Sequence, residues 1–193
     1  MIIQATPYGT KKEEPFAFTY SGDFTDERVD GIGDVTLNTS GVFEVLSGKA
    51  TVSVYILGAG GGGASDIANS WTIRVGTGGG GGKQTVEVEL VPGTYEIVIG
   101  NGGAGATNGY YEAIAEKGGD TVAFGYTSTG GSGGYAYRLG SIIAGSGGAP
   151  NGNAGVTVEQ SNPELAGGSP NGGGVSNKYG QDGGNGLVRI TFS

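Results

Sequence analysis

Hydrophobic and polar residues alternate with a period of two along the stretches that separate the glycine runs of this chain. In KQTVEVELV, residues 83–91, valines and a leucine alternate with Glu87 and Glu89. This period predicts a strand with one buried face and one solvated face. The same pattern predicts further strands at residues 34–38, 42–46, 50–57, 71–75, 94–100, 120–124, 156–159 and 187–193.

Two local features refine this strand pattern. The turn VPGT places Pro92 and Gly93 at the central positions of a type II turn, which predicts a hairpin over 83–100. A helical period of 3.6 is weak everywhere, and its best instance is YYEAIAEK at 110–117, which is long enough for one or two turns. The pattern therefore predicts an all-β protein with at most one short helix.

Glycine runs separate the strands from residue 58 onward. The chain contains 45 glycines in 193 residues, about three times ordinary usage. Their spacing is irregular, unlike the strict third-residue period of collagen. Two structures stay open for these runs: flexible loops, or extended helices of the polyproline II type that bond laterally. The recurrence of the runs with short spacers between them favours the packed helices.

The first glycine run, GAGGGG at 58–63, spells G-x-G-x-x-G directly after a strand. A dinucleotide site also needs a helix after this turn. The chain instead reaches the strand-like WTIRV within a few residues. In GTGGGGGKQ, Gln84 stands where a Walker A loop has Ser or Thr. Neither run predicts nucleotide binding, and no cofactor is expected.

Composition and charge exclude several classes of function. Cysteine and histidine are absent, which excludes disulfides, thiolate nucleophiles, Ser-His-Asp triads and zinc sites of the usual kind. The net charge of −8 argues against nucleic acid and anionic membranes as partners. The N-terminal stretch has no pattern of a signal peptide, and no apolar stretch is long enough for membrane insertion.

The order of the strands and glycine runs resembles the glycine-rich domain of phage and prophage tail-fibre proteins. The pieces that carry the resemblance are SGVFEVLSGKATVSVYILGAGGGG, GGGGGKQTVEVELVPGTYEIVIGNGGAG, GGDTVAFG, STGGSGG and the final strand. They cover residue 40 to the C-terminus, with Val122 where Ser is common. The resemblance implies a jelly-roll-like β-sandwich with packed polyglycine segments, in a virion protein that touches the host surface, often as a homotrimer.

The resemblance and the composition together give the expected organisation and function. Residues 1–40 are expected to form an N-terminal attachment arm or extra strands, and 41–193 the glycine-rich β domain. The expected function is that of a non-enzymatic adhesin, virion-borne or prophage-encoded, that binds a bacterial surface glycan or outer-surface protein. The alternative is a purely structural virion component, an attachment or trimerisation module that contacts other tail proteins.

Aromatic residues in the spacers between the glycine runs are the candidate receptor contacts. In the resembling adhesins the glycine segments act as scaffold and the spacers form the binding loops. Aromatic side chains stack on sugar faces and offer rigid contact area. A core role is an open alternative for the tryptophan and for the tyrosines of the YAY segment. The candidates are Trp71, Tyr110, Tyr111, Tyr135, Tyr137 and Tyr179.

A glycosidase activity would require paired carboxylates. Glu112 and Glu116 lie four positions apart, and Asp66 or Asp120 could join them. A carboxylate pair is the minimum that glycoside hydrolysis requires. Nothing in the sequence singles out two of these groups, so no enzymatic activity is expected.

Overall fold

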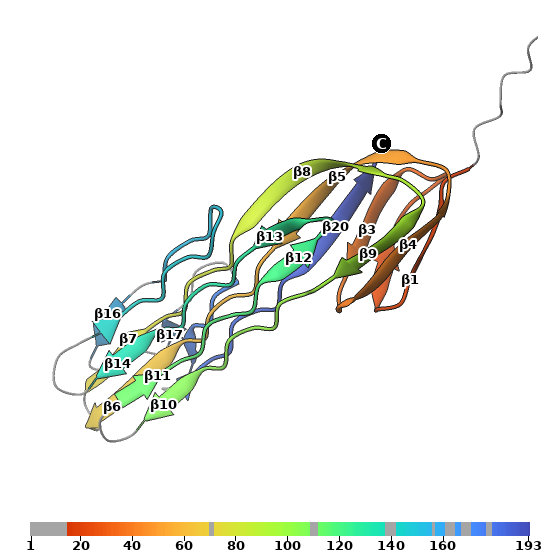
Figure 1. The fold of residues 1–193 in the computed structure, drawn as a ribbon. Coiled ribbons are helices and arrows are strands. Elements are labelled where there is room, and N and C mark those ends of the chain that lie inside the picture. Colours follow the sequence, from red (N-terminus) through yellow and green to blue (C-terminus); the bar gives the residue numbers. More distant parts are fainter. Residues whose placement is uncertain are drawn as a thin grey trace, which may run out of the picture.

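The computed structural model describes residues 15–69, 72–108, 112–137, 142–155, 157–160, 165–166, 171–176 and 179–193. Every regular element in these ranges is a β-strand, which confirms the predicted all-β class. The described residues include no helix that is long and apolar enough to cross a membrane. The molecule is elongated: a β-sandwich with the C-terminus lies at one end, and extended segments lead from it to a group of short strands at the other (Figure 1).

Two sheets form the sandwich. The first pairs its strands in the order β2-β3-β20-β5-β8 and the second in the order β1-β4-β9. A hairpin of β12 (Thr121–Ala123) and β13 (Tyr126–Ser128) adjoins the second sheet through a bridge between Val98 and Val122. The remaining bounds are β1 (Ala17–Tyr20), β2 (Phe24–Asp26), β3 (Gly33–Leu37), β4 (Gly41–Ser47), β5 (Ala50–Leu57), β8 (Lys83–Leu90), β9 (Gly93–Ile97) and β20 (Leu187–Phe192).

The core of the sandwich is built from the alternating apolar positions of both sheets. Phe43 on β4 is fully buried. Its ring stacks on Phe18 with 4.6 Å between centroids and meets Phe124 edge-on at 5.6 Å. Phe124 reaches this place because it adopts φ 51° ahead of Gly125 at φ 84°, the positive pair that a two-residue hairpin turn of type I′ requires. The Phe-Gly pair of the sequence therefore closes the β12–β13 hairpin over the core.

The predicted hairpin over 83–100 is wrong. β8 pairs with β5, and β9 pairs with β4 in the opposite sheet, so the VPGT segment crosses between the sheets instead of joining paired strands. Gly93 has φ 155°, far from the value of about 80° for the second central residue of a type II turn. The Tyr95 hydroxyl donates to the Val91 carbonyl at 3.0 Å and holds the crossing. Longer cross-strand pairings with β5 and β4 overrode the local turn preference.

Glycine runs continue from the ends of the sandwich strands and lie side by side (Figure 1). The central run, residues 58–63, extends from β5. Its N–H groups donate in turn to three neighbouring segments, so that each neighbour receives every third donor at 2.8–3.1 Å. This is the three-residue turn of polyproline II geometry. The acceptors are carbonyls of Gly82 and Gly79, of Gly119 and Glu116, and of Gly184 and Gln181.

The carbonyls of the central run are satisfied in the same way from its other sides. The carbonyls of Ala59 and Gly62 accept from Gly131 and Gly134. Those of Gly60 and Gly63 accept from Gly103 and Ala106, and that of Gly61 from Gly173. The central run is therefore bonded laterally all around its axis. The glycine runs form the packed polyglycine bundle that the sequence favoured over flexible loops.

Close backbone contact explains why these positions are glycine. A Cβ atom on Gly61 would overlap the Ser132 carbonyl, and one on Gly78 would overlap the Gly61 carbonyl. The central run is buried throughout. With no side chain, neighbouring backbones approach closely enough for each to bond to the next. Weak Cα–H···O contacts become possible at the same spacing.

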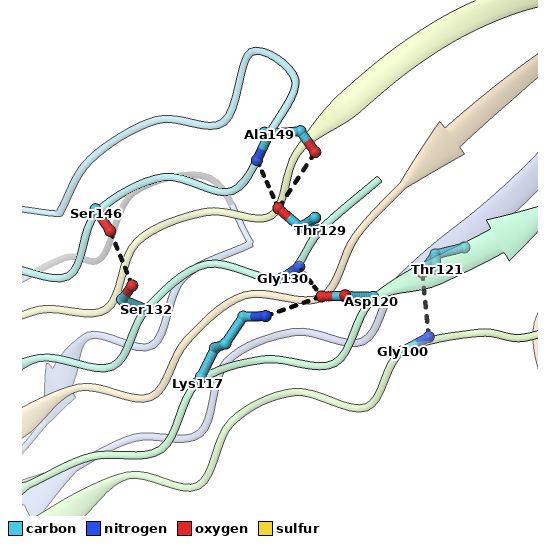
Figure 2. Close-up of polar contacts among 9 residues, drawn as sticks. All are labelled: Gly100, Lys117, Asp120, Thr121, Thr129, Gly130, Ser132, Ser146 and Ala149. Atoms are coloured by element: carbon cyan, nitrogen blue, oxygen red, sulfur yellow. Dashed lines mark hydrogen bonds and ion pairs between the residues drawn. The ribbon is translucent and has the colours of Figure 1, made fainter. Parts of the chain in front are cut away.

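Side chains add hydrogen bonds between neighbouring segments of the bundle. Figure 2 shows Asp120 accepting from the Gly130 N–H at 2.9 Å and from Lys117 Nζ at 3.0 Å. The Thr129 hydroxyl accepts from the Ala149 N–H at 2.7 Å, and the Thr121 hydroxyl from the Gly100 N–H at 3.1 Å. The Ser132 and Ser146 hydroxyls share a hydrogen bond of 2.8 Å. The Gly100–Thr121 bond is buried and the others are exposed or partly exposed, and each bond links neighbouring segments of the chain.

Asp120 makes one of these contacts dependent on pH. The Gly130 N–H and the Lys117 ammonium hold the pKa of the Asp120 carboxyl below 3.8, the value for an unperturbed aspartate. A lowered folded-state pKa stabilises the fold above 3.8, and this contribution is lost as the pH falls through the folded value. We expect Asp120→Ala to cost up to about 1 kcal/mol at pH 7, since the group is half exposed, and to cost less below pH 3.8. Urea unfolding of both proteins at pH 7 and pH 3 measures the difference. Equal differences at both pH values would contradict the linkage.

The predicted helical turns at 110–117 are also wrong where the structure describes them. Glu112–Ile114 form strand β11, which pairs with Tyr135–Tyr137. After it, the Ala115 N–H donates to Gly134 and the Glu116 N–H to Ala104. The N–H groups of Ala115 and Glu116 therefore bond to neighbouring runs instead of bonding within a helix. Residues 115–120 form one more segment of the bundle.

Candidate functional site

The spacers between the glycine runs gather at the end of the molecule opposite the sandwich (Figure 1). We call this group of short strands the tip. At each spacer the chain reverses direction. The chain leaves the sandwich along one glycine run and returns to it along another. The tip strands are β6 (Ala64–Asn69), β7 (Thr72–Gly76), β10 (Ala106–Asn108), β11 (Glu112–Ile114), β14 (Tyr135–Tyr137), β15 (Ile142–Ile143), β16 (Thr157–Gln160), β17 (Leu165–Ala166), β18 (Val175–Ser176) and β19 (Tyr179–Gly180).

Small residues fill the interior of the tip. Three sheets form it, with the orders β10-β6-β7-β16, β11-β14-β15 and β17-β18-β19. Among the described residues, a buried cluster between the first two sheets consists of the alanines Ala64, Ala113, Ala115 and Ala136. Short side chains let the sheets lie close together, as the glycines do in the bundle. Val75 on β7 is also fully buried, whereas the larger side chains of Ile114, Ile143 and Tyr179 on other tip strands are exposed.

The outer face of the β11-β14-β15 sheet presents a row of large side chains. Ile114, Tyr135 and Ile143 lie opposite one another across the three strands, and Glu112 lies opposite Tyr137 in the next row. Paired residues of an antiparallel sheet project from the same face. Ile114 is 63% exposed and Ile143 58%, whereas both tyrosines are half-buried. We call these five residues the tip ladder.

Burial and a neighbouring carboxylate keep one ladder tyrosine, Tyr135, protonated. Burial raises the pKa of the Tyr135 hydroxyl, and a hydrogen bond to the Glu112 carboxylate raises it further. Tyr135 is therefore a neutral donor at neutral pH. Arg74 on β7 donates from Nη1 to the Tyr137 carbonyl at 3.4 Å, which ties the neighbouring sheet to β14. The ladder thus combines apolar area, a phenol and a carboxylate in fixed positions.

The structure brings together two of the predicted site residues and places a third elsewhere on the tip. Tyr135 and Tyr137 share the outer face of β14, opposite the buried Ala136. Tyr179 lies on β19 and is 59% exposed. The remaining three, Trp71, Tyr110 and Tyr111, lie outside the described residues and stay predictions.

The sequence reasoning missed the two isoleucines of the tip ladder. The alternation in Glu112–Ile114 is a strand signal for Ile114, but the predicted helical turns over 110–117 include the same residues. Ile143 has no local signal, because its exposure depends on the pairing of β15 with β14. Cross-strand register brings both residues beside Tyr135.

The candidate carboxylates lie apart in the described structure. Glu112 is in the tip ladder, and Asp120 is engaged at the other end of its glycine run with Lys117 and Gly130. Glu116 contributes its backbone to the bundle, and the side chain of Asp66 lies outside the described residues. In the described part of the chain, no three side chains of His, Cys, Asp or Glu form a group able to hold a metal ion.

The fold and tip together define a class of protein: an all-β sandwich whose strands extend into a polyglycine bundle that carries a group of short sheets. Residues 36–189 match the family described as glycine-rich domain. The match extends from strand β3 to strand β20 and covers most of the chain, so the chain belongs to this glycine-rich domain family. A search of curated proteins found no match.

Proposed function

We propose that this protein is a non-enzymatic adhesin of a phage or prophage tail fibre, which binds a glycan or an outer-surface protein of a bacterium through its tip. The observation that carries the proposal is the gathering of the spacers at one end, remote from the sandwich where the C-terminus lies (Figure 1). An attachment protein needs this separation, because one end joins the virion while the other meets the receptor.

The close packing of the bundle supports the proposal. Its central run is buried and bonded on all sides, so the tip strands start and end on a rigid base. Binding loops on a rigid scaffold lose little conformational freedom when they bind. The tip ladder supplies the aromatic and aliphatic side chains that dominate binding at such surfaces. The homotrimer implied by the tail-fibre resemblance would present several tips and raise avidity.

One observation favours the second candidate, a purely structural virion component. Val42 and Leu46 are exposed on the outer face of β4 in the sandwich, beside the exposed Val98 after β9. Another tail protein that covered this face would bury apolar area without any role for the tip. The two candidates differ in one respect that can be measured, since only the adhesin binds cells.

Replacing the ladder tyrosines should weaken cell binding. We expect the double variant Tyr135→Ser/Tyr137→Ser to bind a susceptible strain at least about tenfold more weakly, because central aromatic anchors carry most of the binding energy at interfaces. Fluorescently labelled protein, titrated onto a panel of bacterial strains and measured by flow cytometry, gives the affinity. The matched control is Tyr126→Ser, which removes a 40% exposed tyrosine from β13 in the sandwich and should leave binding unchanged.

Two outcomes would count against the proposal. Saturable binding that the double variant keeps would exclude the tip ladder as the receptor contact. The Tyr110→Ala/Tyr111→Ala variant would then test the other predicted tyrosines. No binding to any strain by the wild-type protein, together with a stable complex with another tail protein, would favour the structural candidate.

A further inference from the structure

In the described part of the chain, four strands lie at the edges of the sandwich, and three of them are short. β1 has four residues, and its pairing with β4 shifts register between Ala17 and Phe18. β2 and β13 have three residues each. β8 has eight residues and pairs with β5 in one continuous register. Long, regular edge strands are the ones most able to pair with another chain, so β8 differs from the other three edges.

The hydrogen bonds where β8 begins show which of its backbone groups point away from the sheet. The Gly58 N–H donates to the Gly82 carbonyl at 2.8 Å, one position beyond the pair of Leu57 and Lys83 that ends the β5–β8 ladder. Alternate pairs of an antiparallel ladder exchange hydrogen bonds, so the even-numbered residues of β8 direct their backbone groups toward β5. The odd-numbered residues direct theirs outward, namely Lys83, Thr85, Glu87 and Glu89.

The first of these outward residues is bonded, and the next three are open. The Lys83 N–H donates to the Pro150 carbonyl at 2.6 Å, and the Lys83 carbonyl accepts from Asn151 Nδ2 at 3.4 Å. Within the described residues, the N–H and carbonyl groups of the other three bond to no further segment, and all three residues are exposed. This stretch, 85–89, is close to the ordinary length of a strand. We call it the open edge.

Charge disfavours a second copy of β8 as the occupant of the open edge. Pro150 and Asn151 already bond to the outward backbone groups of Lys83, so another strand can pair only beyond this residue. A second copy confined to the open edge would place the glutamates of the two chains, Glu87 and Glu89, opposite each other. Like charges directly opposite each other destabilise strand pairing. The carboxylates therefore keep two copies apart at neutral pH, as charged side chains on edge strands commonly do.

The same two carboxylates complement a basic strand. Glu87 and Glu89 are exposed on the outer face of the sheet, and neither forms an ion pair within the described residues. They lie two positions apart, the spacing of successive side chains on one face of a strand. Val86 and Val88 project from the opposite face and are half-buried. A strand with Lys or Arg opposite the glutamates and apolar side chains opposite the valines would form favourable cross-strand pairs on both faces.

We propose that the open edge receives an extended segment of another protein, in which Lys or Arg alternates with apolar residues. The segment adds an antiparallel strand beside β8 to the β2-β3-β20-β5-β8 sheet. Its main chain exchanges up to about six hydrogen bonds with Thr85, Glu87 and Glu89. These bonds supply affinity, and the alternating side chains supply selectivity. The surface lies on the sandwich, so the proposal is independent of receptor binding by the tip.

Two synthetic peptides of about seven residues, with blocked ends, test the proposal. One alternates lysine with valine, and the other alternates glutamate with valine. Each is titrated into isotope-labelled full-length protein, and the backbone amide spectrum is recorded. We expect the lysine peptide to shift the amides of Thr85, Glu87 and Glu89 saturably and to slow their exchange with solvent. The glutamate peptide should bind at least about tenfold more weakly. Shifts without slower exchange at the open edge would overturn the proposal, because they would indicate nonspecific attraction to an acidic protein.

A proline in the open edge tests the main-chain pairing. The N–H of Glu87 points outward and has no partner in the described residues, which is the position on an edge strand where proline is tolerated. We therefore expect Glu87→Pro to keep the fold, checked by circular dichroism and thermal unfolding. It should weaken binding of the lysine peptide at least about tenfold, because it removes a central donor and obstructs the new strand. A folded Glu87→Pro protein with the wild-type affinity would overturn the proposal.

Charge reversal tests the selectivity and does not depend on the proline variant. The double variant Glu87→Lys/Glu89→Lys should invert the preference, so that the glutamate peptide binds more tightly than the lysine peptide. The matched control Glu44→Lys/Glu96→Lys makes the same change of net charge on exposed residues of β4 and β9 in the other sheet, and it should keep the wild-type preference. An unchanged preference in the first variant, or an inverted one in the control, would overturn the proposal. Neither result bears on cell binding by the tip.

Discussion

Gly61→Ala is expected to abolish the native fold. Gly61 lies in the middle of the central run and is buried. Its new Cβ atom would overlap the carbonyl groups of both Ser132 and Gly131. The obstructing atoms are backbone, so no rotamer change can relieve the overlap, and a whole glycine segment would have to move. We expect a loss of at least about 3 kcal/mol, above the usual cost of overpacking a core.

The measurement is thermal unfolding followed by circular dichroism, with amide exchange of the central run as a second probe. Ala104→Ser is the matched control, because Ala104 lies in a neighbouring run, already carries a Cβ atom and is exposed. We expect it to change stability by less than about 0.5 kcal/mol. A Gly61→Ala protein with the wild-type Tm would show that the runs are not packed as described.

Most sandwich strands could be predicted because they carry their own alternating pattern, whereas the short strands β1, β2 and β13 were not predicted individually. The prediction at 50–57 coincides with β5, and that at 187–193 differs from β20 by one residue. In such segments the alternation of apolar and polar residues shows which face is buried and which is exposed. The 83–100 hairpin failed for the opposite reason. Its local turn signal was sound, but the partners of β8 and β9 lie far away in the sequence.

The arrangement of the bundle could not be predicted from its own residues. A glycine run has no side chain that distinguishes one neighbour or one register from another. The sequence therefore indicated that the runs pack but not that 58–63 would be the central one. The register comes from the strands at both ends, such as β5 before the central run and β6 after it.

The candidate site was predicted in part. The spacers identified Tyr135 and Tyr137, because aromatic residues between glycine runs are conspicuous. The row that joins them to Ile114 and Ile143 needed the cross-strand register.

Phe43→Ala is the second substitution with a large expected effect, and it tests how the two halves of the molecule depend on each other. Phe43 is fully buried, and its ring contacts Phe18 and Phe124 from other strands. Removing a large buried aromatic ring costs about 3–5 kcal/mol. The matched control is Phe24→Ala, since Phe24 is 42% exposed and should cost about 1 kcal/mol or less.

The loss should extend to the bundle, although Phe43 lies in the sandwich. Glycine loses more backbone entropy on folding than any other residue, and the apolar side chains that the described part of the tip buries are few, namely four alanines and Val75. The runs therefore depend on the sandwich strands that fix their ends. We expect Phe43→Ala to weaken amide-exchange protection at 58–63 by the same free energy as in β5. If those glycine amides stayed protected while the sandwich amides exchanged, the bundle would be a separate folding unit. The bundle would then support the tip strands without a folded sandwich.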